Sequence, residues 1–459
     1  MSLMPQAEAM PVTALNSRDA ELPVESLKAL DWLNFSLAAL LMGFGPFVAV
    51  HLAENGWAPA SIGAILTIGG LAGLMTQVPA GELIDVIESK RALFAAAAAT
   101  AALALTILAL RSDFPSVSGA AVVQGAVGSV LGPSVAAISL GLVGHDALGE
   151  RLGRNQRFAS IGGLSAAAIM GAIGYLLSTR GIFLFAATLA IPLLWALLRI
   201  RGADIHFGRS CGAPDHHASK PSRASRRTLF KDVRFLAFVT CLFLFQLANA
   251  SILPLVSESL VHSEGRSSSL AVSALIVLPQ IVVALLSPWV GRTAATWGRR
   301  PLLLLGLAVV PIRSGLSALT ADPALLVILQ LMDGFTGATL GVLTTLIIAD
   351  LTSGTGRFNL AQGLAGTFSG VGASLATSVT GIVTQRFGYA AGLLSVTGVG
   401  LMAVVVVLIF MPETKPATQP PEDFPDHAVG GSGSATADKF PVRDGRARRP
   451  LDERVSGRS

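Results

Sequence analysis

Residues 291 to 302 read GRTAATWGRRPL, a short basic stretch set between two long apolar runs. A related stretch, GELIDVIESKRAL, fills residues 81 to 93 and is also flanked by apolar runs. Each stretch begins with a glycine and carries a pair of basic residues, and the two glycines, Gly81 and Gly291, are 210 positions apart. The two stretches therefore indicate an internal repeat.

Other landmarks recur at nearly the same offset. Pro46 in the first apolar run corresponds to Pro254, 208 positions later. A set of small residues at three- and four-residue spacing recurs at an offset of 209: Gly125, Gly128 and Gly132 in the first half, and Gly334, Gly337 and Gly341 in the second. Such spacing lets helix backbones approach closely, so we expect these glycines to pack helices together. Landmarks at nearly one offset across half the chain predict two homologous halves.

The composition indicates a membrane protein. Of the 459 residues, 52% are hydrophobic and only 13% are charged, too few charges to cover a soluble globule of this size. The net charge of +5 does not indicate a nucleic-acid partner, because the basic residues occur in short loops and tails rather than on one face. Residues 1 to 26 lack the apolar core of a signal peptide, so we expect the first spanning helix to act as the insertion signal.

A helix rises about 1.5 Å per residue, so a hydrocarbon layer of about 30 Å requires about 20 apolar residues. Twelve runs meet this requirement, and we expect an all-α membrane protein with two pseudo-symmetric bundles of six transmembrane helices. The predicted spans are 28 to 52, 61 to 84, 92 to 111, 116 to 143, 157 to 178, 181 to 200, 235 to 259, 268 to 290, 301 to 320, 323 to 350, 360 to 385 and 389 to 411.

The lysine and arginine residues predict the orientation of the chain. If the N-terminus is cytoplasmic, 28 of the 33 basic residues lie in cytoplasmic segments, and Arg313 lies inside a span. The opposite side then holds four basic residues: Arg111, Arg180, Arg266 and Arg386. We therefore expect a multi-pass protein of the cell inner membrane, in contact with the lipid bilayer and with both termini in the cytoplasm.

This topology divides the chain into five segments. They are a cytoplasmic tail 1–27, a six-helix bundle 28–200, a basic cytoplasmic linker 201–234, a second six-helix bundle 235–411 and a disordered cytoplasmic tail 412–459. The linker contains His216 and His217, which we expect to be inert because metal sites usually recruit three or four ligands. Only two cysteines occur, Cys211 in the linker and Cys241 in an apolar run, so no disulfide is expected.

This organisation resembles that of the major facilitator superfamily. The shared features are two six-helix halves, a long basic linker and a basic stretch after the second helix of each half. In that family the stretch follows Gly-x-x-x-Asp-x-x-Gly-(Arg/Lys)-(Arg/Lys). The corresponding residues here are Gly81, Asp85, Lys90 and Arg91 in the first half and Gly291, Arg292, Gly298, Arg299 and Arg300 in the second. Each copy is incomplete, because Glu88 replaces the second glycine of the first copy and Ala295 replaces the aspartate of the second. Ala121 also replaces the arginine that family members often carry three residues before Gln124, which argues against arginine-based proton coupling.

The resemblance implies a secondary transporter whose two bundles rock about a central site lined by the first, fourth, seventh and tenth helices. It also implies that Asp85 meets a basic group or a helix N-terminus and latches one conformation, the alternative being a solvated loop aspartate. No phosphate-binding loop occurs, so an ion or solute gradient should supply the energy. No Ser/His/Asp or metal-ligand cluster lies on the predicted helices, and we expect neither an enzyme nor a metal or other cofactor.

Two charged residues are predicted inside the lipid, where a charge costs about 2.5 to 3.5 kcal/mol on insertion scales. Arg313 and Asp333 lie at matching depths in consecutive spans, so we expect them to pair. The pair is either a static salt bridge between the ninth and tenth helices or a functional site. In the second case Asp333 titrates or binds solute, and Arg313 tunes its pKa.

Five further polar residues are candidates for the solute or ion pathway: Asp31 and Asn34 in the first span, Gln124 in the fourth, and Gln246 and Asn249 in the seventh. The alternative for Asp31 is helix capping or contact with lipid headgroups. The alternative for the amides is hydrogen bonding to neighbouring backbones, worth about 0.6 kcal/mol each.

These features predict a monomeric secondary transporter that exports a small drug-like or metabolite solute in exchange for protons. The alternatives are an uptake permease for a small metabolite and a non-transporting receptor or assembly factor with the same fold. The intact repeat and the charges inside the lipid argue against the receptor or assembly factor.

Cysteine labelling tests the predicted orientation. We expect Thr320→Cys to react with a membrane-impermeant thiol reagent in intact cells, because position 320 follows a span that ends outside. Gly430→Cys should react only after lysis, because it lies in the C-terminal tail. The reverse labelling pattern would place the termini outside and reject the orientation.

Overall fold

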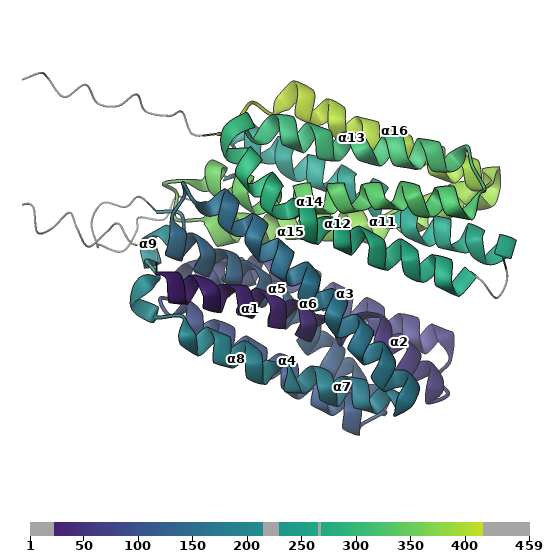
Figure 1. The fold of residues 1–459 in the computed structure, drawn as a ribbon, viewed down its shortest axis with the longest axis horizontal. Coiled ribbons are helices and arrows are strands. Elements are labelled where there is room, and N and C mark those ends of the chain that lie inside the picture. The colour runs from purple at the N-terminus through teal and green to yellow at the C-terminus, as the bar shows by residue number, and fades with distance from the viewer. Residues whose placement is uncertain (1–22, 214–228, 265–267, 416–459) are drawn as a thin grey trace, which may run out of the picture. The chain divides into compact units, whose positions relative to one another are not determined.

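The computed structural model describes residues 23–213, 229–264 and 268–415, and within them it is helical with no strand. The predicted all-α membrane fold is confirmed, because each of the twelve predicted spans coincides with one helix or with two consecutive helices. Figure 1 shows the helices of the first half, purple to teal, gathered in one bundle and those of the second half, teal to yellow, in another. The pair His216 and His217 lies outside the described residues.

The first bundle holds eight helices, because two of its six spans are interrupted. They are α1 Val24–Met42, α2 Gly45–Glu54, α3 Pro59–Val86, α4 Lys90–Leu110, α5 Phe114–Val143, α6 Leu148–Leu176, α7 Thr179–Thr188 and α8 Ala190–Arg199. The described part of the linker adds a short 3-10 turn, η2 Gly202–Asp204, and α9 Phe207–Ser210.

The second bundle holds six helices, each matching one predicted span. They are α11 Val233–Glu264, α12 Ser268–Trp297, α13 Arg299–Ala318, α14 Pro323–Thr352, α15 Phe358–Phe387 and α16 Tyr389–Phe410.

Prolines explain the two interruptions in the first bundle. Proline has no backbone N–H and its ring clashes with the carbonyl four residues earlier, so it weakens the helix just before it. Pro46 follows the break between α1 and α2, and Pro192 follows the break between α7 and α8. The predicted spans 28 to 52 and 181 to 200 are thus each made of two consecutive helices.

Several helices also extend past the predicted lipid-spanning segments. α12 continues to Trp297, so that only Gly298 of the quoted basic stretch lies between two helices. α6 begins at Leu148, nine positions before the predicted start at 157, and its first turns carry charged residues. Hydropathy places these residues outside the lipid, but it does not decide whether they are helical.

Eleven spans of the described residues are long and apolar enough to cross a membrane. The remaining predicted span is α15, which has 30 residues but many glycines, serines and threonines in place of aliphatic side chains. α15 packs against α3 of the first bundle as well as against α11 and α16 of its own, so part of its surface faces protein rather than lipid. This position explains its lower hydropathy.

The repeat extends to individual hydrogen bonds. Lys90 Nζ donates to the carbonyl oxygen of Ile84 at the end of α3. In the second half, Arg299 Nη1 donates to the carbonyl oxygen of Ala294 near the end of α12, at 3.1 Å. The first basic residue of each pair thus caps the helix before it.

The second basic residue of each pair reaches the last helix of its own half. Arg91 Nη2 lies 3.5 Å from the carbonyl oxygen of Leu198 in α8. Arg300 Nη2 lies 2.7 Å from the carbonyl oxygen of Leu408 in α16. A cation near the C-terminal end of a helix is favourable, so both pairs bind their bundle together in the same way.

Gly125 and Gly334 occupy equivalent helix crossings. A Cβ at Gly125 would collide with the carbonyl oxygen of Gly69 in α3 and lie 2.9 Å from the nitrogen of Gly73. A Cβ at Gly334 would lie 2.6 Å from the carbonyl oxygen of Pro279 in α12. Contacts are looser at Gly337 and Gly341, where the nearest atoms would be side-chain atoms at 3.1 Å.

The same role was wrongly predicted for Gly128 and Gly132. No heavy atom lies within 4 Å of a Cβ built at either position. Both glycines line a cavity, because they lie further along α5 than its crossing with Gly69 and Gly73. Sequence spacing alone does not distinguish a glycine at a helix crossing from one beside a cavity.

A matched pair of alanine substitutions on α5 tests this difference. Gly125→Ala should lower thermal stability by about 1 to 3 kcal/mol, because the new methyl group forces α3 and α5 apart. Gly128→Ala should be neutral or stabilising by up to about 1 kcal/mol, because alanine is the better helix former and its methyl group enters open space. Thermal unfolding of the purified protein measures both, and equal losses would contradict the assigned crossing.

Candidate functional site

The two bundles meet at the end that carries residues 81–91 and 291–300, which we call the basic end. Asp85, in the last turn of α3, is completely buried there. Its carboxylate accepts hydrogen bonds from the backbone N–H groups of Asn359, at 3.1 Å, and Leu360, at 2.9 Å. The side-chain amide of Asn359 donates a third bond, at 2.8 Å. An aspartate of the first half therefore caps the first turn of α15 in the second half.

The chemistry of a helix start explains this contact. The first turn of a helix has N–H groups without intrahelical acceptors and carries a partial positive charge, so a carboxylate stabilises it. Of the two partners predicted for Asp85, a basic group or a helix N-terminus, the structure places a helix N-terminus in direct contact. Which helix supplies it could not be read from the sequence, because Asn359 lies 274 positions away.

The linker completes the same cap. The backbone N–H of Phe358 donates to the carbonyl oxygen of Cys211, at 3.2 Å. Cys211 Sγ lies 3.4 Å from Lys90 Nζ, beside the end of α3. The linker, the first bundle and the second bundle thus converge on the start of α15.

The second half has no equivalent cap, because Ala295 stands where the aspartate would be. The backbones at Gly291 and Gly149 approach directly instead, and a Cβ at Gly149 would lie 2.9 Å from the carbonyl oxygen of Gly291. Nearby, His145 Nε2 lies 2.6 Å from Asp350 Oδ1, which joins the loop before α6 to the end of α14. Sequence reasoning missed both His145 and Asp350, since each lies at the end of an apolar run without a recognisable motif.

Asp350 also binds Arg299, whose Nε lies 2.9 Å from Asp350 Oδ2. Glu413, just after α16, accepts from the backbone N–H groups of Arg299, at 2.8 Å, and Arg300, at 3.1 Å. Burial raises the pKa of Glu413, but these backbone N–H donors outweigh it, so the pKa lies below its usual value. The disordered tail predicted from 412 was therefore placed too early, because Glu413 caps α13. Arg292 is exposed and donates only to Pro288 of its own helix.

Inside the second bundle, Arg313 is the centre of a polar cluster. Its Nη1 lies 2.9 Å from Asp333 Oδ1 of α14, so the two residues form an ion pair. The same guanidinium donates to Asn249 of α11, at 2.5 Å, and to Gln330 of α14, at 3.1 Å. The Arg313 side chain is 2% exposed and that of Asp333 is 30% exposed, so only the carboxylate is accessible. Sequence analysis did not identify Gln330 as a member of this cluster.

Gln246, a predicted pathway residue, lies one turn before Asn249 on α11 and is half-buried.

The remaining pathway candidates lie within the first bundle. Asp31 of α1 is buried and pairs with Arg151 and Arg154 of α6, with Arg154 Nη2 at 2.6 Å. Asn34 donates to the carbonyl oxygen of Leu30 in its own helix, at 2.7 Å. Asp31 therefore neither caps α1 nor meets headgroups, and the pathway role predicted for it and Asn34 is not supported by these positions.

Gln124 is also buried away from the interface between the bundles. Its Nε2 donates to the carbonyl oxygen of Ala101 in α4, at 3.0 Å. The side chain bonds a neighbouring backbone, which was the alternative reading for the amides. The pathway prediction for Gln124 therefore finds no support in its position.

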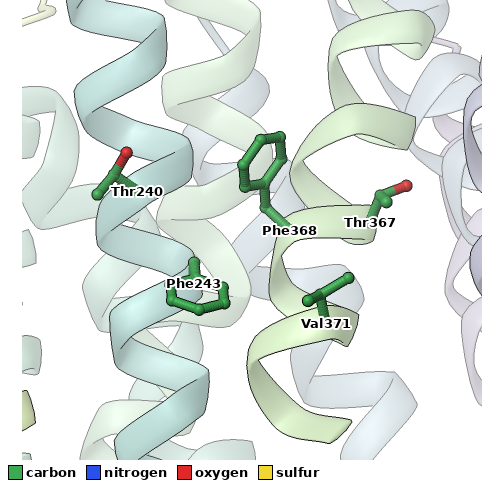
Figure 2. A pocket seen from close by; sticks show the side chains of 5 residues that line it. All are labelled: Thr240, Phe243, Thr367, Phe368 and Val371. Carbon is green, nitrogen blue, oxygen red and sulfur yellow. The ribbon is translucent and has the colours of Figure 1, made fainter. Parts of the chain in front are cut away.

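Two cavities border α15. One, of about 350 Å³, lies between the bundles and is lined by α3, α5, α14 and α15. The other, of about 260 Å³, lies between α11 and α15 and is lined by Thr240, Phe243, Thr367, Phe368 and Val371. In Figure 2 the rings of Phe243 and Phe368 lie between the two helices, so this second cavity is mainly apolar. Among the described residues, no group of three His, Cys, Asp or Glu side chains could hold a metal ion.

Comparison of the chain with a family profile and with individual proteins matches it to membrane transporters. The profile of the family described as Major Facilitator Superfamily matches residues 31–260 and 238–453. An uncharacterized MFS-type transporter of Mycobacterium tuberculosis is 36% identical over 396 residues, covering 85% of this chain and 94% of that protein. The class B tetracycline resistance protein of Escherichia coli is 35% identical over 107 residues, covering 23% of this chain and 26% of that protein.

Solved structures share the fold. The human organic anion transporter MFSD10 superposes with a TM-score of 0.67 at 13% identity, covering 84% of this chain and 100% of that chain. The nucleoside transporter NupG superposes with a TM-score of 0.58 at 18% identity, covering 84% of this chain and 99% of that chain.

Asp85→Asn tests the contact across the bundles. Asparagine keeps the size of the side chain but removes the charge that favours the start of α15, so the basic end should open more often. Spin labels at Glu88→Cys and Ser353→Cys, two exposed positions on opposite bundles, should report a larger fraction of long distances in Asp85→Asn.

Asp113→Asn is the matched control, because Asp113 caps α5 within a single bundle, where it accepts from the N–H of Ser116 at 3.1 Å. It should leave the distance distribution between the labels unchanged. An Asp85→Asn distribution equal to that of Asp113→Asn would show that the cap does not hold the bundles together.

Proposed function

Because the chain belongs to the Major Facilitator Superfamily and is a multi-pass membrane transporter of that family, we propose that it exports a small solute in exchange for protons. Its relatives are transporters rather than enzymes. The proposal includes alternating access of one central pathway, a monomer, and a location in the cell inner membrane with both termini cytoplasmic. The excess of basic residues in the segments assigned to the cytoplasm supports this orientation.

The cap on α15 is the observation that carries the alternating-access part of the proposal. Asp85 joins the bundles through hydrogen bonds to N–H groups that water at an open cytoplasmic face can replace. The second contact at this end is the close approach of the backbones at Gly149 and Gly291. Both contacts close the basic end, and opening them would admit solute from the cytoplasm.

The match to a tetracycline resistance protein supports export of a drug-like solute. A member of a transporter family can confer resistance by lowering the drug concentration inside the cell, which is the direction proposed here. An uptake permease remains the alternative, and the direction of flux in oriented vesicles distinguishes the two.

We propose Asp333 as the proton-coupling group. Its side chain is 30% exposed and that of Arg313 is 2% exposed, so the carboxylate is the more accessible member of the pair. Protonation of Asp333 would remove the charge that balances the buried guanidinium, and Asn249 of α11 would then be a main remaining partner. If Arg313 then bonded mainly to Asn249 of α11 rather than to Asp333 of α14, protonation would change how these two helices pack in the second bundle.

Substitution of the pair separates its structural role from its functional role. Arg313→Leu should reduce folded yield, because breaking an internal ion pair costs about 3 to 5 kcal/mol, and adding Asp333→Leu should restore it. In proteoliposomes with an imposed proton gradient, the double variant should lose concentrative transport of drug-like probes, tetracycline among them, while retaining exchange.

Arg386→Leu is the control for folded yield, because Arg386 is an exposed arginine in the last turn of α15. It should express like the unmodified protein. Folded yield of the double variant no better than that of Arg313→Leu would reject the structural pairing. Concentrative transport by the double variant would remove Asp333 from the coupling mechanism.

A further inference from the structure

The cavity of about 350 Å³ between the bundles has a polar but uncharged wall. Its polar side chains are Gln77 of α3, Ser129 of α5, Thr344 and Thr345 of α14, and Gln362 and Ser369 of α15. The rest of the wall consists of glycine, alanine, proline and isoleucine, so neither a histidine nor a charged side chain lines it. The volume lies within the usual range for small-molecule sites.

Hydrogen-bonding groups in this wall are left without protein partners. Oε1 of Gln77 and Nε2 of Gln362 are buried, and neither makes a hydrogen bond in the described structure. A buried polar atom without a partner is costly, so both carboxamides would gain hydrogen bonds by turning toward an occupant of the cavity.

The cavity hydroxyl groups on α14 and α15 also lack a hydrogen-bond partner in the described structure. Away from the cavity, Thr339, Thr352 and Thr367 each donate to the carbonyl oxygen four residues earlier, as threonines in helices commonly do. Of the cavity hydroxyls, that of Ser129 is already bonded, to the carbonyl oxygen of Ala126 at 2.6 Å and to the hydroxyl of Thr76 in α3 at 3.1 Å. The other hydroxyls are therefore available to an occupant.

The two glutamines come from opposite bundles. Gln77 lies against α15, where a Cβ at Gly366 would be 2.6 Å from its Oε1. Gln362 is on α15 itself, one turn before Gly366. Gly128 and Gly132 of α5 leave the facing wall open, since no heavy atom lies within 4 Å of a Cβ at either. A solute in this cavity would touch both halves at once.

We propose that this cavity binds an uncharged solute that offers both hydrogen-bond donors and acceptors, held by the carboxamides of Gln77 and Gln362. Each carboxamide supplies both a donor and an acceptor. A charged group placed there would lose its hydration without gaining a counter-ion, which hydrogen bonds to amides do not repay. This inference rests on the proposed transport function and names the class of its solute.

The cavity is separate from the coupling group and close to the cap on α15. Thr344 is 11 residues from Asp333 along α14, about 16 Å at 1.5 Å per residue. Gln362 is four residues from Phe358, where α15 begins. Solute contacts would therefore act on the start of α15, which Asp85 caps, and would not need the charge of Asp333.

Binding to the purified full-length protein tests the solute class directly. The probes are pairs that match closely in size and differ in charge: galactose and galacturonate, glucose and glucosamine, thymidine and 5′-amino-5′-deoxythymidine. At least one neutral member should raise the thermal unfolding midpoint, and its charged partner should bind at least about tenfold more weakly, since tenfold corresponds to 1.4 kcal/mol.

Gln77→Leu and Gln362→Leu should each weaken binding of that neutral probe by about tenfold, the effect of one lost buried hydrogen bond. Gln362→Glu keeps the size and adds a charge, so it should abolish neutral binding even if a leucine variant folds poorly. Gln385→Leu is the matched control, because Gln385 is exposed near the other end of α15, and it should bind as the unmodified protein does.

Three results would overturn the proposal: no shift with any neutral probe, tighter binding of a charged partner, or unchanged affinity in both leucine variants. Binding that meets every expectation without proton-driven flux would reject the proposed coupling and leave the solute class standing. Flux of a charged solute that stays unchanged in Gln77→Leu and Gln362→Leu would reject the proposed solute class and leave the proposed coupling standing.

Discussion

The closed basic end depends on one electrostatic requirement, the need of a buried helix start for hydrogen-bond acceptors. The first turn of α15 lies between the two bundles, and its N–H groups are satisfied by Asp85 from the first bundle and by Cys211 of the linker. Lys90 lies beside Cys211, with its Nζ 3.4 Å from Cys211 Sγ. Three separate parts of the chain are thus held at one point, and all of the bonds involved can be exchanged for water if the bundles part.

The two halves are built alike internally but make different contacts at the interface between the bundles. In both halves the basic pair binds the end of the preceding helix and the end of the last helix, so the halves share their internal construction. At the interface the symmetry stops, because Ala295 offers no carboxylate. The contact between His145 and Asp350 takes its place, whereas close glycine backbones occur on both sides, at Gly81 and at Gly291. One side of the interface therefore adds a charged cap to this backbone packing, and the other adds a histidine.

Charged and neutral polar groups are kept apart inside the protein. Asp31 is paired with two arginines inside the first bundle, and Arg313 is paired with Asp333 inside the second. Each pair avoids the large penalty of an isolated charge in a medium of low dielectric constant. The cavity between the bundles holds only amides and hydroxyl groups among its polar lining side chains, so the surface that a solute would meet is selective by hydrogen bonding rather than by charge.

The sequence by itself determined the twelve spans, the two halves and the partner of Arg313. Lipid forces each span to satisfy its own backbone, and the length and hydropathy of the apolar runs therefore identify the helices. The family resemblance also implied that Asp85 meets a basic group or a helix N-terminus. Only the tertiary structure decided that this partner is the start of α15, that Asp31 pairs with Arg151 and Arg154, and that Gly128 and Gly132 border a cavity while Gly125 packs a crossing. These choices depend on which faces of distant helices meet, and helix periodicity carries no information about contacts between residues far apart in the chain.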